Sequence, residues 1–182
     1  HAYVRRQRQM CIRDSLLAPL LIMIYLPNDQ LNLISVILFI FIALTDFFDG
    51  FFARRQNITS EFGKMLDPIA DKLLVVGVLI VLMIKGTIDD LSILPALLII
   101  FREIFISGLR EFAANRNSQA SIDVSQVGKL KTAIQMLSLF LILSSLVLKD
   151  LVILLNIGII FLWISMLLAL ISGYKYYKSV FN

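Results

Sequence analysis

Residues 46–71 read DFFDGFFARRQNITSEFGKMLDPIAD. Apolar residues flank this stretch on both sides, so that its two ends belong to long hydrophobic runs at 31–52 and 65–84. Each run reaches the roughly 20 residues that a helix needs to cross a bilayer. The stretch therefore predicts two membrane helices joined by a short polar connector, with acidic residues near the joined ends of both.

Hydrophobic runs recur along the rest of the chain, at 16–26, 91–109, 130–148 and 151–173. The chain has 182 residues, of which 59% are hydrophobic, whereas water-soluble domains average about 45–50%. The run at 16–26 is shorter than a full span, and the others are long enough. The pattern predicts an all-α fold, an integral membrane bundle of six transmembrane helices in one domain.

The basic residues gather in alternate connectors, at 5–13, 53–64, 102–131 and 174–178. Because cytoplasmic loops collect Lys and Arg, we expect a multi-pass protein of the cytoplasmic (inner) membrane with both termini in the cytoplasm. The chain has one cysteine and one histidine, which is terminal. These counts argue against an internal disulfide, a zinc site and a Ser-His-Asp triad.

Four aspartates stand out because charged residues in membrane segments are costly and normally mark function. Asp46 and Asp49 are three residues apart, and Asp67 and Asp71 are four apart, so each pair shares one face of a helix. Four carboxylates in one pocket repel each other, and two divalent cations relieve the repulsion. Carboxylate oxygens suit Mg²⁺ or Mn²⁺, and two such ions can clamp a displacement at phosphorus.

The neighbours of the aspartates fit a nucleotide site. Gly50, Ala53 and Gly63 are small enough for a large ligand to approach the helix backbone, and Arg54 offers a fork of donors to a phosphate. Each has an alternative explanation. Small residues also serve helix packing, Arg54 also satisfies the positive-inside rule, and the aspartates would also fit a buried charge network.

The pattern D-x2-D-G-x2-A-R-x8-G-x3-D-x3-D, which runs from Asp46 to Asp71, resembles the signature of the CDP-alcohol phosphotransferase family at every fixed position. The resemblance implies a six-helix membrane enzyme that moves a phosphatidyl group from CDP-diacylglycerol to an alcohol. It further implies that Asp46 and Asp67 bridge two metal ions, that Asp49 and Asp71 each hold one of them, and that Asp71 is the general base. The residues implied at the CDP-lipid site are Gly50, Ala53, Arg54, Ser60 and Gly63, although Ser60 is equally well explained as a loop or helix-cap serine.

Cations further along the chain bear on the choice of alcohol. Arg102 and Arg110 are two helical turns apart, and Lys129 and Lys131 begin the next apolar run. Four cations at the expected mouth of the pocket suit an acceptor that itself carries phosphate. The alternatives are positive-inside topology and, for the arginines, pairing with the adjacent acids Glu103 and Glu111.

Two less specific motifs narrow the choice of acceptor alcohol. They are the segment that starts at Arg102-Glu103 and the segment GKLKTAIQ at 128–135. Both resemble segments of the phosphatidylglycerophosphate synthase subfamily. This resemblance implies sn-glycerol 3-phosphate as the acceptor and phosphatidylglycerophosphate and CMP as the products, in acidic phospholipid biosynthesis.

The N-terminal residues 1–15, HAYVRRQRQMCIRDS, depart from the family pattern. Family members usually open with an N-x-L-T-x-x-R-like segment, which is not found here. We expect residues 1–15 to be an atypical segment that is truncated or non-native, 16–178 to form the membrane domain, and 179–182 to be a tail.

Other functions compete with this interpretation. The same chemistry on inositol phosphate, serine or phosphatidylglycerol is the nearest alternative. A cation carrier would distribute its acids through the membrane and often show repeated halves, and a structural scaffold would not need the aspartates. We expect CDP-diacylglycerol, glycerol 3-phosphate and membrane lipids as partners and no nucleic acid, and the resemblance allows a homodimer.

Overall fold

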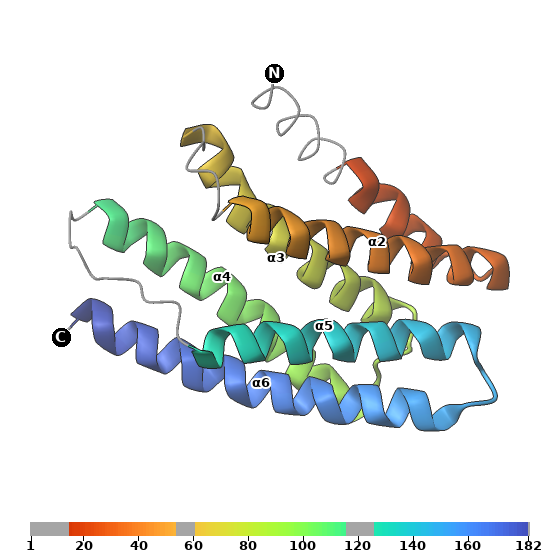
Figure 1. Ribbon diagram of the computed structural model, residues 1–182. Helices are drawn as coiled ribbons and strands as arrows, with labels where there is room; N and C mark the ends of the chain where they lie inside the picture. Colours follow the sequence, from red (N-terminus) through yellow and green to blue (C-terminus); the bar gives the residue numbers. More distant parts are fainter. Residues whose placement is uncertain (1–14, 54–60, 116–125, 182) are drawn as a thin grey trace, which may run out of the picture. The chain divides into compact units, whose positions relative to one another are not determined.

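The computed structural model describes residues 15–53, 61–115 and 126–181, with side chains at 15–45, 72–113 and 127–181. The described residues form six α-helices and one short 3-10 helix. The first helix is Ser15–Tyr25. It is followed by α2 (Asp29–Ala53), α3 (Glu61–Ile84), η1 (Asp90–Ser92), α4 (Ile93–Asn115), α5 (Gln126–Val147) and α6 (Val152–Phe181), and Figure 1 labels α2 to α6.

The predicted all-α class is confirmed, and one helix corresponds to each predicted apolar run. Several helices extend beyond the apolar run at a basic end. Helix α4 continues to Asn115, α5 begins at Gln126, and α6 continues to Phe181 and so includes 179–181 of the expected tail. Lys and Arg are good helix formers, so a helix continues where the hydrophobic pattern stops.

Three stretches of the described residues are long and apolar enough to cross a membrane. They are Asp90–Ala113, Val127–Val147 and Val152–Phe181, and the last is 30 residues long. Shorter apolar helical stretches cover Ser15–Tyr25, Asp29–Thr45 and Lys72–Ile84. The chain is therefore an integral membrane protein, with three full spans among the residues whose side chains are described.

Exposed side chains support the same conclusion. Phe101, Ile104 and Phe105 on α4 are 56–64% exposed, and Ile160 and Leu167 on α6 are 57% and 55% exposed. Water-soluble proteins rarely show contiguous apolar patches of this kind. These faces are suited to lipid.

The chain divides into two compact units, His1–Thr87 with Leu143–Leu151, and Ile88–Ile142 with Val152–Asn182. In the first unit, the first helix packs closely on α3. A Cβ added at Gly77 would lie 3.0 Å from Cδ1 of Leu21, so the small residue permits this approach. Its buried apolar core is formed by Leu20, Ile24, Val36, Phe39, Ile42, Leu74, Val75, Val78, Leu79, Leu82 and Leu143.

Helix α3 ends in a left-handed glycine cap. Gly86 has φ +72°, its N–H donates to the carbonyl of Met83 at 3.0 Å, and the N–H of Thr87 donates to the carbonyl of Leu82 at 3.0 Å. This is the Schellman arrangement, which satisfies the last carbonyls of a helix. The cap turns the chain sharply away from the helix axis.

Lys85 joins three segments of the first unit. Its Nζ donates to the carbonyl oxygen of Ile24 at 2.5 Å and to Oδ1 of Asn32 at 2.9 Å. A carbonyl near a helix C-terminus lacks an intrahelical donor and carries partial negative charge. Lys85 therefore ties the end of the first helix and the start of α2 to the end of α3.

The second unit contains α4, α6 and the part of α5 up to Ile142. Helices α5 and α6 approach each other closely at Gly158, where an added Cβ would lie 2.7 Å from Cγ1 of Ile142. Ser138 Oγ donates to the carbonyl oxygen of Gly158 at 2.7 Å. Because Gly158 has no side chain, the two helices can approach this closely, and the hydrogen bond from Ser138 stabilises their crossing.

Candidate active site

The first pair of expected metal ligands lies on α2. Asp46 and Asp49 fall near the C-terminal end of the helix, three positions apart, and Gly50 and Ala53 follow them. At helical spacing the positions 46, 49, 50 and 53 lie along one side of the helix. The side chains themselves lie outside the described residues.

The second pair lies on α3. Gly63, Asp67 and Asp71 occupy the first half of the helix, with the two acids four positions apart. The predicted face sharing within each pair therefore agrees with the backbone. These side chains too are outside the described residues, so the cage of four carboxylates stays a prediction.

Two predicted CDP-lipid contacts, Arg54 and Ser60, lie in the segment between α2 and α3, which is outside the described residues. Among the side chains that the structure does describe, no group of three His, Cys, Asp or Glu residues could hold a metal ion. The metal prediction therefore depends wholly on the acids at 46–71.

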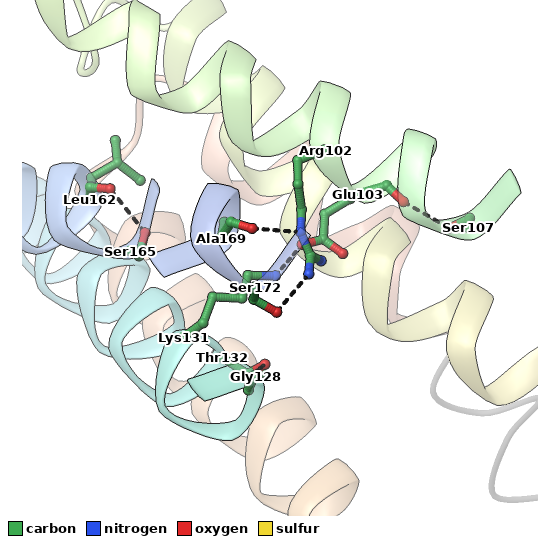
Figure 2. Close-up of polar contacts among 10 residues, drawn as sticks. All are labelled: Arg102, Glu103, Ser107, Gly128, Lys131, Thr132, Leu162, Ser165, Ala169 and Ser172. Carbon is green, nitrogen blue, oxygen red and sulfur yellow. Dashed lines mark hydrogen bonds and ion pairs between the residues drawn. The ribbon is translucent and has the colours of Figure 1, made fainter. Parts of the chain in front are cut away.

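The second unit contains a buried polar cluster at the predicted acceptor-phosphate residues (Figure 2). The guanidinium of Arg102 donates three hydrogen bonds, from Nε to the carbonyl oxygen of Ala169 at 3.1 Å, from Nη1 to Oε1 of Glu103 at 3.1 Å, and from Nη2 to Oγ of Ser172 at 3.2 Å. Gly173 lies beside Arg102, and a Cβ added there would make ordinary van der Waals contact, at 3.6 Å, with both Cγ and Nε of Arg102. Helix α6 thus holds the guanidinium in a defined position.

Lys131 of α5 joins the same cluster. Its ammonium forms an ion pair with Oε1 of Glu103, and the two side chains are only 7% and 8% exposed. One carboxylate therefore serves two cations, and the three groups together carry a net charge of +1. Burial makes each of these charges depend on its partners.

The other two residues predicted to bind the phosphate of the acceptor are exposed at the surface. Arg110 is exposed, and its guanidinium carbon is 5.7 Å from the centre of the Tyr176 ring on α6, a cation–π contact. Lys129 is exposed on the first turns of α5. The structure thus brings Arg102 and Lys131 together through Glu103 and leaves Arg110 and Lys129 at the surface.

Of the alternatives to a phosphate role, pairing with an adjacent acid does occur at Arg102, which pairs with Glu103. Glu103 in addition pairs with Lys131. The sequence did not single out Ser172 or the backbone oxygen of Ala169, because both are on α6, about 70 residues away. No local signal marks these contacts. They follow from the packing of α4 on α6.

The cluster contains the kinds of side chain that bind anions. Arg102 uses three of its five N–H donors on the described residues, and the net positive charge favours a phosphate. An arginine fork beside a lysine matches the donors that phosphate oxygens need.

Comparison with known proteins supports one family. The family model described as CDP-alcohol phosphatidyltransferase matches residues 10–171. The chain is 41% identical over 165 residues to the CDP-diacylglycerol–glycerol-3-phosphate 3-phosphatidyltransferase of Rickettsia typhi, covering 88% of this chain and 87% of that protein.

Proteins with the same name from two further organisms are similarly close. The protein of Rickettsia bellii is 42% identical over 167 residues, covering 88% of this chain and 87% of its own length. That of Wigglesworthia glossinidia brevipalpis is 44% identical over 157 residues, covering 86% and 84%. The acid pattern on α2 and α3, the membrane helices and these likenesses agree, and the chain belongs to the CDP-alcohol phosphatidyltransferase family.

Proposed function

We propose that this protein transfers the phosphatidyl group of CDP-diacylglycerol to sn-glycerol 3-phosphate, releasing CMP and forming phosphatidylglycerophosphate. The observation that carries the proposal is the acid pattern at 46–71, which occurs on two consecutive helices of a chain 41–45% identical to proteins named for this reaction. The cluster of Arg102, Glu103 and Lys131 supports a phosphate-bearing acceptor, because its net charge is positive and its donors suit a phosphate.

The four aspartates at 46–71 fit two Mg²⁺ or Mn²⁺ ions, because carboxylate oxygens suit these ions and the stretch contains no histidine or cysteine. Asp46, Asp49, Asp67 and Asp71 would hold the ions. When bound, the ions supply charge neutralisation of the pyrophosphate and of the departing phosphate.

The protein groups carry out the remaining steps. Asp71 accepts the proton of the attacking hydroxyl of glycerol 3-phosphate. The hydroxyl oxygen forms a bond to the β-phosphorus as the bond between that phosphorus and the CMP oxygen breaks, and Arg54 balances the charge on CMP. Gly50, Ala53 and Gly63 leave space for the nucleotide, and Ser60 contacts it.

Arg102 and Lys131 hold the phosphate of the acceptor, with Arg110 and Lys129 at the entrance. Basic residues at this end of α4 and α5 agree with a site that faces the cytoplasm from the cytoplasmic membrane. The family resemblance suggests a homodimer, and the exposed apolar faces are compatible with one.

Release of CMP by the purified protein in detergent tests the proposal. With CDP-diacylglycerol and Mg²⁺, we expect turnover with glycerol 3-phosphate and little with inositol phosphate, serine or phosphatidylglycerol, and we expect EDTA to abolish it. Asp71→Asn should lower kcat at least about 100-fold, which is typical for loss of a general base.

Asp150→Asn is the matched control, because Asp150 is an exposed aspartate in the connector between α5 and α6. It should keep wild-type activity. Turnover with serine or inositol phosphate, and none with glycerol 3-phosphate, would overturn the acceptor and keep the family chemistry.

A further inference from the structure

The side-chain amide of Gln135 is a buried donor for which the described part of the chain supplies no acceptor. The residue is 2% exposed, and its Nε2 finds no hydrogen-bond partner among the residues that the structure describes. Burial of an amide donor without an acceptor is unfavourable. Native proteins keep few such groups, and each needs an explanation.

The position of Gln135 on α5 shows which residues surround its amide. Lys131 lies one turn before it and Ser138 about one turn after it, so the three share one face of the helix. Lys131 contacts Glu103 on α4, and Ser138 contacts Gly158 on α6. Gln135 therefore faces the interior of the second unit, next to the cluster of Arg102, Glu103 and Lys131.

The chemistry of this neighbourhood points to a ligand with two kinds of oxygen. Lys131 and Arg102 suit a phosphate, and Gln135 offers a neutral N–H donor about 6 Å further along the helix axis, one turn of four residues. A short phosphorylated alcohol has its phosphate at one end and hydroxyl oxygens within this distance. Such a molecule would satisfy the cations and the amide together.

We propose that Gln135 is a specificity-determining residue, whose Nε2 donates a hydrogen bond to the middle hydroxyl of glycerol 3-phosphate. The assignment rests on the proposed function. The terminal hydroxyl of the acceptor must stay free to attack phosphorus, so the middle hydroxyl is the one left for Gln135. The side chain has three rotatable bonds, and changes of rotamer on binding are common, so the amide can turn toward the ligand.

The test compares two acceptors by CMP release from full-length protein in detergent. Glycerol 3-phosphate has the middle hydroxyl, and 3-hydroxypropyl phosphate keeps the phosphate and the terminal hydroxyl but has hydrogen in its place. We expect wild-type kcat/KM to favour glycerol 3-phosphate at least about tenfold, because a buried donor is left unpaired by the analogue.

Gln135→Met keeps an unbranched side chain of similar size and removes the donor. It should lower kcat/KM for glycerol 3-phosphate only, so that the ratio between the two acceptors falls to within about threefold of one. Gln135→Glu is a second variant of the same shape, has no donor when ionised, and should also lose the preference. Ser138→Ala is the control, since it removes a buried hydrogen bond to Gly158 and should affect both acceptors by the same factor.

Three results would overturn the assignment: a wild-type enzyme without preference, a preference that survives Gln135→Met, or an equal loss with both acceptors in that variant. The last result would indicate a packing role. If the wild-type protein released CMP with neither acceptor, the proposed function would fail first, and the assignment with it.

Discussion

Glu103 on α4 forms a buried ion pair with Lys131 on α5, 28 positions further along the chain. The same carboxylate accepts a hydrogen bond from Arg102. Removal of one member of a buried charge group leaves the others without compensation, at a typical cost of 3–5 kcal/mol. Among the side chains that the structure describes, Glu103 is the acid that both cations share, so a substitution there should affect the whole cluster.

Glu103→Leu should lower the free energy of unfolding by about 3–5 kcal/mol, because two cations then lack their shared partner. Glu111→Gln is the control on the same helix, since Glu111 is exposed, and it should change stability by less than about 0.5 kcal/mol. Denaturant unfolding in detergent measures both. Equal stability of the two variants would contradict a central role for Glu103.

The four predicted acceptor cations should differ in their effect on binding. Lys131 is buried beside Glu103, whereas Arg110 is exposed over the Tyr176 ring. Lys131→Met should raise KM for glycerol 3-phosphate at least about tenfold, a loss of about 1.4 kcal/mol. Arg110→Met should raise KM by less, because an exposed charge is screened by water and salt. A larger effect at Arg110 would place the phosphate at the surface instead.

Two glycines on neighbouring helices should respond in opposite ways to substitution by alanine. A Cβ at Gly158 would lie 2.7 Å from Cγ1 and 3.2 Å from the backbone nitrogen of Ile142, so Gly158→Ala should destabilise the protein by about 1–3 kcal/mol. A Cβ at Gly108 meets nothing within 4 Å, so Gly108→Ala should stabilise α4 by up to about 1 kcal/mol. Thermal unfolding of the two variants, side by side, checks the difference in sign.

Lys85 should make the free energy of unfolding depend on pH in the alkaline range. Burial lowers the pKa of Lys85 below its usual 10.5, Lys149 lowers it further, and Asp29 acts in the opposite direction. In the window just below 10.5 the unfolded chain holds a proton that the folded chain has lost. Stability rises with pH where the unfolded state binds more protons, so the free energy of unfolding should increase as the pH rises through this window.

Lys85→Met should remove that increase and, at neutral pH, also lose the bonds to Ile24 and Asn32. Lys178→Met, at an exposed lysine of α6, should keep the wild-type slope of stability against pH. Unfolding in detergent across the alkaline range provides the slope. A wild-type slope in Lys85→Met would assign the pH dependence to another group.

The helices were predictable because hydrophobic runs, all but the first of them about 20 residues long, alternate with charged connectors. Their ends were less predictable, since Arg110 and Lys129 continue helices that the apolar pattern ends at 109 and begins at 130. The acid spacing at 46–71 predicts the candidate site, because hard ions such as Mg²⁺ are held by carboxylate oxygens.

Contacts between distant segments could not be read from the sequence. Lys85 directly follows the apolar run at 65–84, and no local pattern indicates a partner for it, yet its Nζ donates to the carbonyl oxygen of Ile24, 61 residues earlier. The motif at 128–135 pointed to Lys131, while the unpaired amide of Gln135 became evident only when burial was known. Packing decides such contacts, and no local pattern encodes it.

Helix α6 has 30 residues and is therefore about 45 Å long, while the hydrocarbon layer is only about 30 Å thick. Its last three turns contain Tyr174, Lys175, Tyr177 and Lys178, all of them exposed. Such residues prefer the level of the lipid headgroups. The end of α6 would thus anchor the helix at the membrane interface and fix its depth in the bilayer. In a thinner or thicker bilayer, α6 would therefore change its tilt and would not shift along its axis.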